Sequence, residues 1–199
     1  VAIGNKPVLW HIMKIYAHYG FKEFIIALGV KGSKIKEYFS NYDLINNDFS
    51  IDLSSGAISY HNRCDDYDWK VTLVDTGLNT LKGGRIKRLE KYLTDDINMV
   101  TYGDGIADIN INYLVDYHKA HGKVITVTGV HPPARFGELV EIDGRVTSFK
   151  EKPQNSLGLI NGGYMVFNRK LLEHLTPDDD SDFEFGPLEK LAKEGGMKI

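Results

Sequence analysis

Short apolar segments rich in β-branched residues alternate along this chain with amphipathic segments of helical spacing, and glycine or a carboxylate closes most of the apolar ones. Residues 23–29 and 70–76 are two such apolar segments, and each is followed by a pattern with apolar residues three or four apart. A strand that is buried on both faces has a near-continuous apolar sequence, because helices cover the sheet on each side. The alternation therefore predicts a doubly wound α/β fold with a mostly parallel, mixed sheet flanked by helices.

The same patterns set the expected boundaries of the elements. Asp143-Gly144 between two alternating runs predicts an inserted β-hairpin over residues 139–150, where antiparallel pairing is clearest. A second hairpin, on the surface, is expected over 49–60, and a glycine-rich loop over 77–84. The expected helices are 6–19, 33–42, 85–93, 111–121, 170–175 and 184–194, and the expected strands are 23–29, 70–76, 97–102, 124–131 and 160–168.

The composition excludes several classes of protein. The single cysteine, Cys64, cannot form an internal disulfide, and the longest apolar run, residues 24–30, is far shorter than the roughly 20 residues that a membrane-spanning helix needs. The formal net charge of -3, with dispersed lysines and arginines, lacks the one-sided basic surface typical of nucleic-acid binding. No basic stretch with an apolar core follows Val1, so we expect a cytoplasmic protein that binds neither membrane nor nucleic acid.

Glycines and carboxylates follow the predicted strands at the edge where α/β sheets bind their ligands. Asp104, in Gly103-Asp104-Gly105, is the clearest candidate, because flanking glycines admit a bulky ligand and Mg²⁺ is held by one or two carboxylates together with phosphate oxygens. The alternative is an aspartate that only completes a turn. Residues 77–85 run into a helix N-terminus, which favours phosphate, and Arg85 adds a fixed charge there.

Other motifs are weaker when taken alone. Glu151 and Lys152 precede a proline at the end of the hairpin and either face a pocket or form an exposed pair. Asn161-Gly162-Gly163 opens a strand and either lets a ligand approach the backbone or forms a bulge. We interpret His118 and His121 as structural and not as zinc ligands, and the acidic run 178–182 as a helix cap at Ser181 or Asp182 and not as a calcium loop.

Several strings occur in an order and spacing that resemble bacterial glucose-1-phosphate cytidylyltransferases, a branch of the sugar nucleotidyltransferase family. The resemblance extends over essentially the whole chain, and the strings around Leu9-Trp10-His11-Ile12-Met13 and Asp75-Thr76-Gly77 distinguish this branch from the thymidylyl, uridylyl and guanylyl branches. The matching strings lie at residues 3–16, 71–77, 83–85, 101–105, 135–137, 149–153 and 160–163.

The resemblance implies a Rossmann-like nucleotide-diphospho-sugar transferase fold and the reaction of CTP with α-D-glucose 1-phosphate, which gives CDP-glucose and pyrophosphate in the synthesis of bacterial surface polysaccharides. Carried over to this sequence, it implies Asp104 as the Mg²⁺ ligand and Lys152 as the contact to the sugar phosphate. It leaves Lys6, which matches a helix-capping position, outside the site. The implied substrate-binding residues are Glu151 and Gly137 at the sugar hydroxyls, Gly77, Gly83 and Gly103 along the nucleotide, and Arg85 and Asn161 near its phosphates or sugar, with Thr76 and Gly162 as further contacts to the substrates.

The sequence also departs from the family pattern. The glycine-rich G-x-G-T-R turn that grips the triphosphate would precede Val1, and the region with the second metal-binding aspartate would follow Ile199. We therefore expect residues 1–199 to be a single nucleotidyltransferase domain that is incomplete at both ends. Members of the family form homo-oligomers, so the resemblance implies a homo-oligomer.

Two other functions remain open from the sequence. Asp104 and Asp108 loosely resemble the carboxylate pair of metal-dependent glycosyltransferases, which require an acceptor sugar for turnover. A domain that binds sugar phosphates or nucleotide sugars without turnover is the other alternative.

Overall fold

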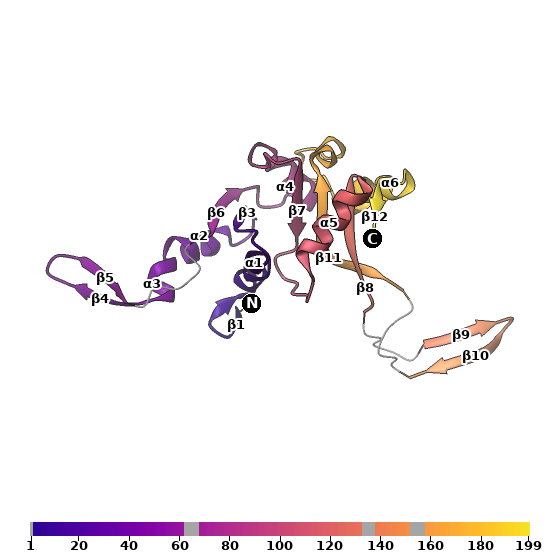
Figure 1. Ribbon diagram of the computed structural model, residues 1–199, viewed down its shortest axis with the longest axis horizontal. Coiled ribbons are helices and arrows are strands. Elements are labelled where there is room, and N and C mark those ends of the chain that lie inside the picture. The colour runs from indigo at the N-terminus through magenta and orange to yellow at the C-terminus, as the bar shows by residue number, and fades with distance from the viewer. Residues whose placement is uncertain (1, 62–67, 133–137, 152–157) are drawn as a thin grey trace.

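The computed structural model describes residues 2–61, 68–132, 138–151 and 158–199 and has strands between layers of helices (Figure 1). Two separate groups of strands form its centre, and they include both parallel and antiparallel pairs, which confirms the mixed α/β class. The first group is the parallel pair β3 (Glu23–Leu28) and β6 (Lys70–Asp75). The second is a four-stranded sheet in the order β12 (Met197–Lys198), β8 (Ile125–Val130), β11 (Ile160–Asn168) and β7 (Ile97–Thr101).

Strand β11 runs antiparallel to both of its neighbours, β7 and β8. Antiparallel pairing thus extends beyond the hairpin where the sequence makes it clearest, and in the described part of the chain the parallel pairs are β3 with β6 and β12 with β8. Strand β11 runs antiparallel to β8 because the chain between them leaves and rejoins the sheet at the same end of the strands, where Ile160 pairs with Val130. The start of β11 therefore lies at the edge where β7 and β8 end.

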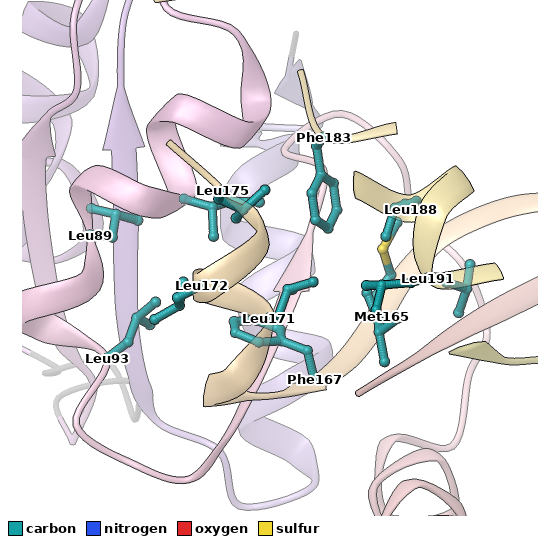
Figure 2. Packing of buried hydrophobic residues seen from close by; sticks show 13 residues of the cluster. Leu89, Leu93, Met165, Phe167, Leu171, Leu172, Leu175, Phe183, Leu188 and Leu191 are labelled. Carbon is teal, nitrogen blue, oxygen red and sulfur yellow. The ribbon is translucent and has the colours of Figure 1, made fainter. Parts of the chain in front are cut away.

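The core lies on both faces of β11, because alternate side chains of a strand point to opposite faces. Tyr164 and Val166 pack against α1 (Val8–His18) and α5 (Ile111–His121). Met165 and Phe167 belong to the cluster on the other face, whose leucines come from several helical segments (Figure 2). Those segments include the 3-10 helix η2 (Arg169–His174) and α6 (Glu189–Lys193), while α4 (Lys82–Arg88) adds Ile86 and is followed directly by Leu89.

The first helices are shorter than the sequence pattern predicts. Lys6–Pro7 form β2, which pairs with β1 (Ala2–Ile3), so α1 begins only at Val8. The predicted helix over 33–42 begins earlier, at Gly32, and divides at Asn41 into α2 (Gly32–Ser40) and α3 (Tyr42–Asn46). Strand β3 is only partly buried along most of its length, because within the described residues it pairs on one side only, with β6.

Two later helical segments also differ from their predicted bounds. Helix α4 begins at Lys82, so Gly83 and Gly84 are helical and not part of a loop, and the 3-10 helix η1 (Glu90–Tyr92) follows it. The predicted helix over 184–194 consists of η3 (Glu184–Leu188) and α6, with non-helical backbone at Phe185 and Gly186. Gly186 has φ 102°, a left-handed conformation that glycine adopts readily, and this breaks the helix.

Both predicted hairpins are present and project from opposite ends of the molecule (Figure 1). They are β4 (Asp48–Asp52) with β5 (Ala57–His61), and β9 (Glu138–Ile142) with β10 (Arg145–Lys150). Asp143 and Gly144 have φ of 51° and 78°, the positive values that a type I′ turn requires. Among the described residues no helix is both long and apolar enough to span a bilayer.

Candidate active site

The end of β7 and the start of β11 form the centre of the candidate site, because the two strands are antiparallel neighbours. Asn161 Nδ2 donates a hydrogen bond to the hydroxyl of Tyr102 at 3.1 Å, and Gly103 and Asp104 directly follow Tyr102. Gly162 lies close to β8, since a Cβ there would be 3.1 Å from the carbonyl oxygen of Thr128. The structure thus brings together Gly103, Asp104, Asn161 and Gly162, and the register shift after Asn161 is the bulge expected from the glycines.

Asp104 has the exposure that a metal ligand needs. Its carboxylate is exposed and makes no hydrogen bond or ion pair with any other residue of the described ranges. A Cβ added at Gly103 or Gly105 would meet no atom within 4 Å, so the space beside the carboxylate is open. No group of three or more His, Cys, Asp or Glu side chains in the described residues converges on a metal position. This donor set fits Mg²⁺ held by one carboxylate and by phosphate oxygens of a ligand.

A second group of candidate residues joins the ends of β3 and β6. Arg85 Nη1 donates to the carbonyl oxygen of Leu28 at 2.9 Å, to Thr76 Oγ1 at 2.8 Å and to the carbonyl oxygen of Gly77 at 2.9 Å. Thr76 is fully buried, and its own hydroxyl donates to Leu28 O at 2.8 Å. The guanidinium of Arg85 therefore fixes the two strand ends and the turn at Gly77, whose φ is +97°.

Gly83 and Gly84 allow α4 to pack directly against the backbone of residues 178–182. A Cβ at Gly83 would lie 2.4 Å from the carbonyl oxygen of Asp182, and one at Gly84 would lie 2.3 Å from that of Asp178. Arg88 holds the same segment, because its guanidinium donates to Pro177 O at 2.8 Å and to Asp179 Oδ1 at 3.1 Å. The surroundings of Gly83 thus indicate a packing role.

The acidic run 178–182 has structural partners. Asp182 Oδ1 accepts hydrogen bonds from the backbone N–H groups of Glu184 at 2.8 Å and Phe185 at 2.9 Å. The N-cap position of η3 is Phe183, which has no side-chain cap, so Asp182 holds the start of this segment from one position before the cap. These backbone hydrogen bonds lower the pKa of the Asp182 carboxyl. Asp179 accepts from the hydroxyl of Thr80 at 2.5 Å, and this bond, ahead of the charge of Arg88, lowers the pKa of Asp179.

The histidines of α5 are structural, as expected. His118 Nδ1 and His121 Nε2 each lie 2.8 Å from the hydroxyl oxygen of Thr126 on β8. Burial lowers the pKa of both imidazoles, and for His118 the neighbouring His121 lowers it further. Two neutral rings that share one hydroxyl fasten the last turn of α5 to the sheet.

Three polar side chains that the sequence analysis did not select lie beside the candidate site. Tyr102 donates a hydrogen bond from its hydroxyl to Glu184 Oε1, and Lys82 Nζ pairs with the same oxygen at 2.5 Å. The ammonium group of Lys82 also lies 5.1 Å from the centroid of the Tyr102 ring. These residues come from α4, the end of β7 and η3, so only the tertiary fold brings them together, and no local pattern would have found them.

The remaining candidates lie elsewhere. Glu151 is exposed directly after β10, and no recorded contact joins it to the other candidates in the described part of the chain. Lys152 and Gly137 lie outside the described residues. A hollow of about 300 Å³ at the ends of β3 and β6 is lined by Lys31, Lys36 and Asp75, among others, and adds charged groups to the same side as Thr76 and Gly77.

Comparisons with known proteins place the chain in a family. The family model described as nucleotidyl transferase matches residues 1–187. A glucose-1-phosphate cytidylyltransferase of Salmonella typhimurium is 46% identical over 198 residues, and a probable glucose-1-phosphate cytidylyltransferase of Bacillus subtilis is 43% identical over 197 residues. Each alignment covers 99% of this chain and 76% of the relative.

Solved structures share the fold. The crystal structure of HddC from Yersinia pseudotuberculosis has a TM-score of 0.63 and 23% sequence identity, and the match covers 96% of this chain and 75% of HddC. This structural similarity supports the α/β fold alone. The family model and the two cytidylyltransferases show which family the chain belongs to. On these findings the chain belongs to the nucleotidyl transferase family.

Proposed function

We propose that this chain transfers the cytidylyl group of CTP to α-D-glucose 1-phosphate and forms CDP-glucose and pyrophosphate. The observation that carries the proposal is the 43% and 46% identity to two glucose-1-phosphate cytidylyltransferases over 99% of the chain. The gathering of Asp104, Asn161 and Gly162 at one edge of the sheet supports it, because this is the edge where α/β sheets bind their ligands. We also propose that residues 1–199 act as one nucleotidyltransferase domain.

The reaction is a displacement at phosphorus. A phosphate oxygen of glucose 1-phosphate forms a bond to the α-phosphorus of CTP, and the bond from that phosphorus to the bridging oxygen of pyrophosphate breaks. No covalent nucleophile from the protein is needed, so the protein contributes by positioning two anionic substrates and by neutralising their charge.

We assign the roles as follows. Asp104 holds the metal, and Mg²⁺ bound there supplies positive charge against the phosphate oxygens. Asn161, Gly162 and the open backbone at Gly103 contact the substrates, while Arg85 holds the turn at Thr76 and Gly77 in place for the nucleotide. Lys152 binds the sugar phosphate, and Glu151 and Gly137 bind sugar hydroxyls, as the resemblance implies.

Pyrophosphate release with CTP, glucose 1-phosphate and Mg²⁺ tests the proposal. The assay is run on this chain and, side by side, on the product of its complete reading frame. We expect release that depends on both substrates and on the metal. Turnover only when an acceptor sugar is added to a nucleotide sugar would indicate a glycosyltransferase. Binding of CDP-glucose without any turnover by either folded protein would indicate a binding domain.

The location and the oligomeric state of the enzyme are part of the same proposal. We propose a cytoplasmic enzyme, because both substrates are soluble phosphorylated metabolites, and a homo-oligomer, as the resemblance implies. Sedimentation or light scattering of the purified protein measures the second property directly.

A further inference from the structure

The hydrogen bonds around Asn161 have a direction that is fixed from both ends. The backbone N–H of Gly163 donates to Asn161 Oδ1 at 2.8 Å, and a backbone N–H can only donate. The oxygen of the amide must therefore face Gly163, which leaves Nδ2 to donate to the hydroxyl of Tyr102 at 3.1 Å.

The other end of this chain of hydrogen bonds is a carboxylate. The hydroxyl of Tyr102 accepts a hydrogen bond from Asn161 Nδ2 and donates one to Glu184 Oε1, and an ionised carboxylate can only accept. Lys82 Nζ forms an ion pair with the same oxygen at 2.5 Å, so this end of the network is held by a second donor. Burial, followed by the hydrogen bond to Glu184, raises the pKa of Tyr102, so its hydroxyl keeps the proton that it donates.

The backbone is shaped to hold Tyr102 in this place. Gly163 has φ +79°, and a Cβ there would lie 2.9 Å from the Tyr102 ring. The ring is therefore packed against the start of β11 on one side, with the Lys82 ammonium 5.1 Å from its centroid. Tyr102 and Asn161 are thus held together by packing as well as by hydrogen bonds.

We propose that Tyr102, held by Glu184 and Lys82, is a positioning residue that orients the amide of Asn161, so that its second N–H faces an acceptor oxygen of the sugar phosphate. This inference rests on the proposed function, in which Asn161 contacts the substrate. The hydrogen-bonding capacity of the amide supports it. One N–H and one oxygen lone pair of Asn161 are used within the network, and the exposed side chain has a second N–H and a second lone pair for a ligand.

Steady-state kinetics of Tyr102→Phe test the proposal. The substitution removes only the hydroxyl, so we expect the KM for glucose 1-phosphate to rise about tenfold, the change that one hydrogen bond supports, while kcat stays within about threefold. Tyr113→Phe is the matched control, because Tyr113 is 71% exposed on α5 and lies outside the network. An unchanged KM in Tyr102→Phe overturns the proposal, and a lower thermal midpoint without a change in KM would mean that Tyr102 only supports the fold.

The double variant separates an effect through Asn161 from an independent one. Asn161→Ala should raise the KM to a similar extent, and adding Tyr102→Phe to it should change the KM by less than about twofold, because the hydroxyl acts through the missing amide. A full further tenfold increase in the double variant would contradict the positioning role.

A measurement on the free protein keeps this inference distinct from the proposed function. The side-chain amide signals of Asn161, identified by their absence in Asn161→Ala, should shift in the ¹⁵N–¹H spectrum of Tyr102→Phe and stay in place in Tyr113→Phe. If the wild-type protein releases no pyrophosphate, the proposed function fails, and titration with glucose 1-phosphate then decides whether the same amide signals report binding. If the amide signals of Asn161 do not shift in Tyr102→Phe, the inference is overturned even in an active enzyme.

Discussion

Replacing Gly83 by alanine would measure how tightly α4 packs against the backbone of residues 178–182. The new Cβ would lie 2.4 Å from the carbonyl oxygen of Asp182 and 2.8 Å from that of Ser181, about 1 Å closer than an ordinary contact. Both atoms belong to the backbone, so no change of rotamer relieves the clash. Overpacking of this kind costs about 1–3 kcal/mol, whereas alanine in a helix gains at most about 1 kcal/mol over glycine.

Two backbone oxygens would lie closer than 3.0 Å to the new Cβ, so we expect the clash to cost about 2–3 kcal/mol, the upper part of that range, and the net loss to be about 1–2 kcal/mol. For a chain of this length that corresponds to a fall of about 2–8 °C in Tm, followed by circular dichroism. Gly105→Ala is the control, because a Cβ there meets no atom within 4 Å, and its Tm should change by less than about 2 °C. A Tm of Gly83→Ala equal to or above that of the wild type would refute the packing argument.

Three further perturbations address the metal ligand, the strand junction and the histidines. Asp104→Ala should lower kcat by about 10²-fold or more with an unchanged Tm, since the exposed carboxylate has no partner among the described residues; near-wild-type turnover would exclude it as the metal ligand. Arg85→Lys should lower the free energy of unfolding by about 1–3 kcal/mol in urea titrations, because one ammonium cannot replace the guanidinium donors at the ends of β3 and β6, and an unchanged midpoint would contradict this. Burial lowers the pKa of His118 and His121, so the unfolded chain binds more protons than the folded protein as the pH falls. The free energy of unfolding should therefore be largest above the unfolded pKa of about 6.5 and decrease as the pH falls below it. His118→Gln should reduce this decrease between about pH 7.5 and pH 5.5.

The sequence predicts those parts of the fold that local patterns determine. Helix α5 and strand β11 have the predicted bounds, because α5 has an Asn110 cap and a glycine end, and the apolar residues 164–167 of β11 lie between two glycines and Asn168. The Asp143-Gly144 turn is likewise determined by two residues that accept positive φ.

Features that depend on distant contacts could not be predicted. Helix α4 extends through Gly83 and Gly84 only because residues 178–182 cover them, and the direction of β11 depends on its neighbours in the sheet. In the candidate site, Asp104 and Asn161 follow from local motifs, whereas Tyr102 and Glu184 are 82 positions apart and meet only in the folded chain.

The pairing of Val130 with Ile160 has a further consequence for how this architecture can diversify. The segment between these two residues starts and finishes at neighbouring positions of the sheet, so it is attached to the body as a closed loop. Its length and sequence can change by exchange of the whole segment, including β9 and β10, while the layers around β11 keep their packing. Since the sugar contacts proposed above, Gly137, Glu151 and Lys152, belong to this segment, we expect that exchanging it changes the sugar preference and leaves the core as it is.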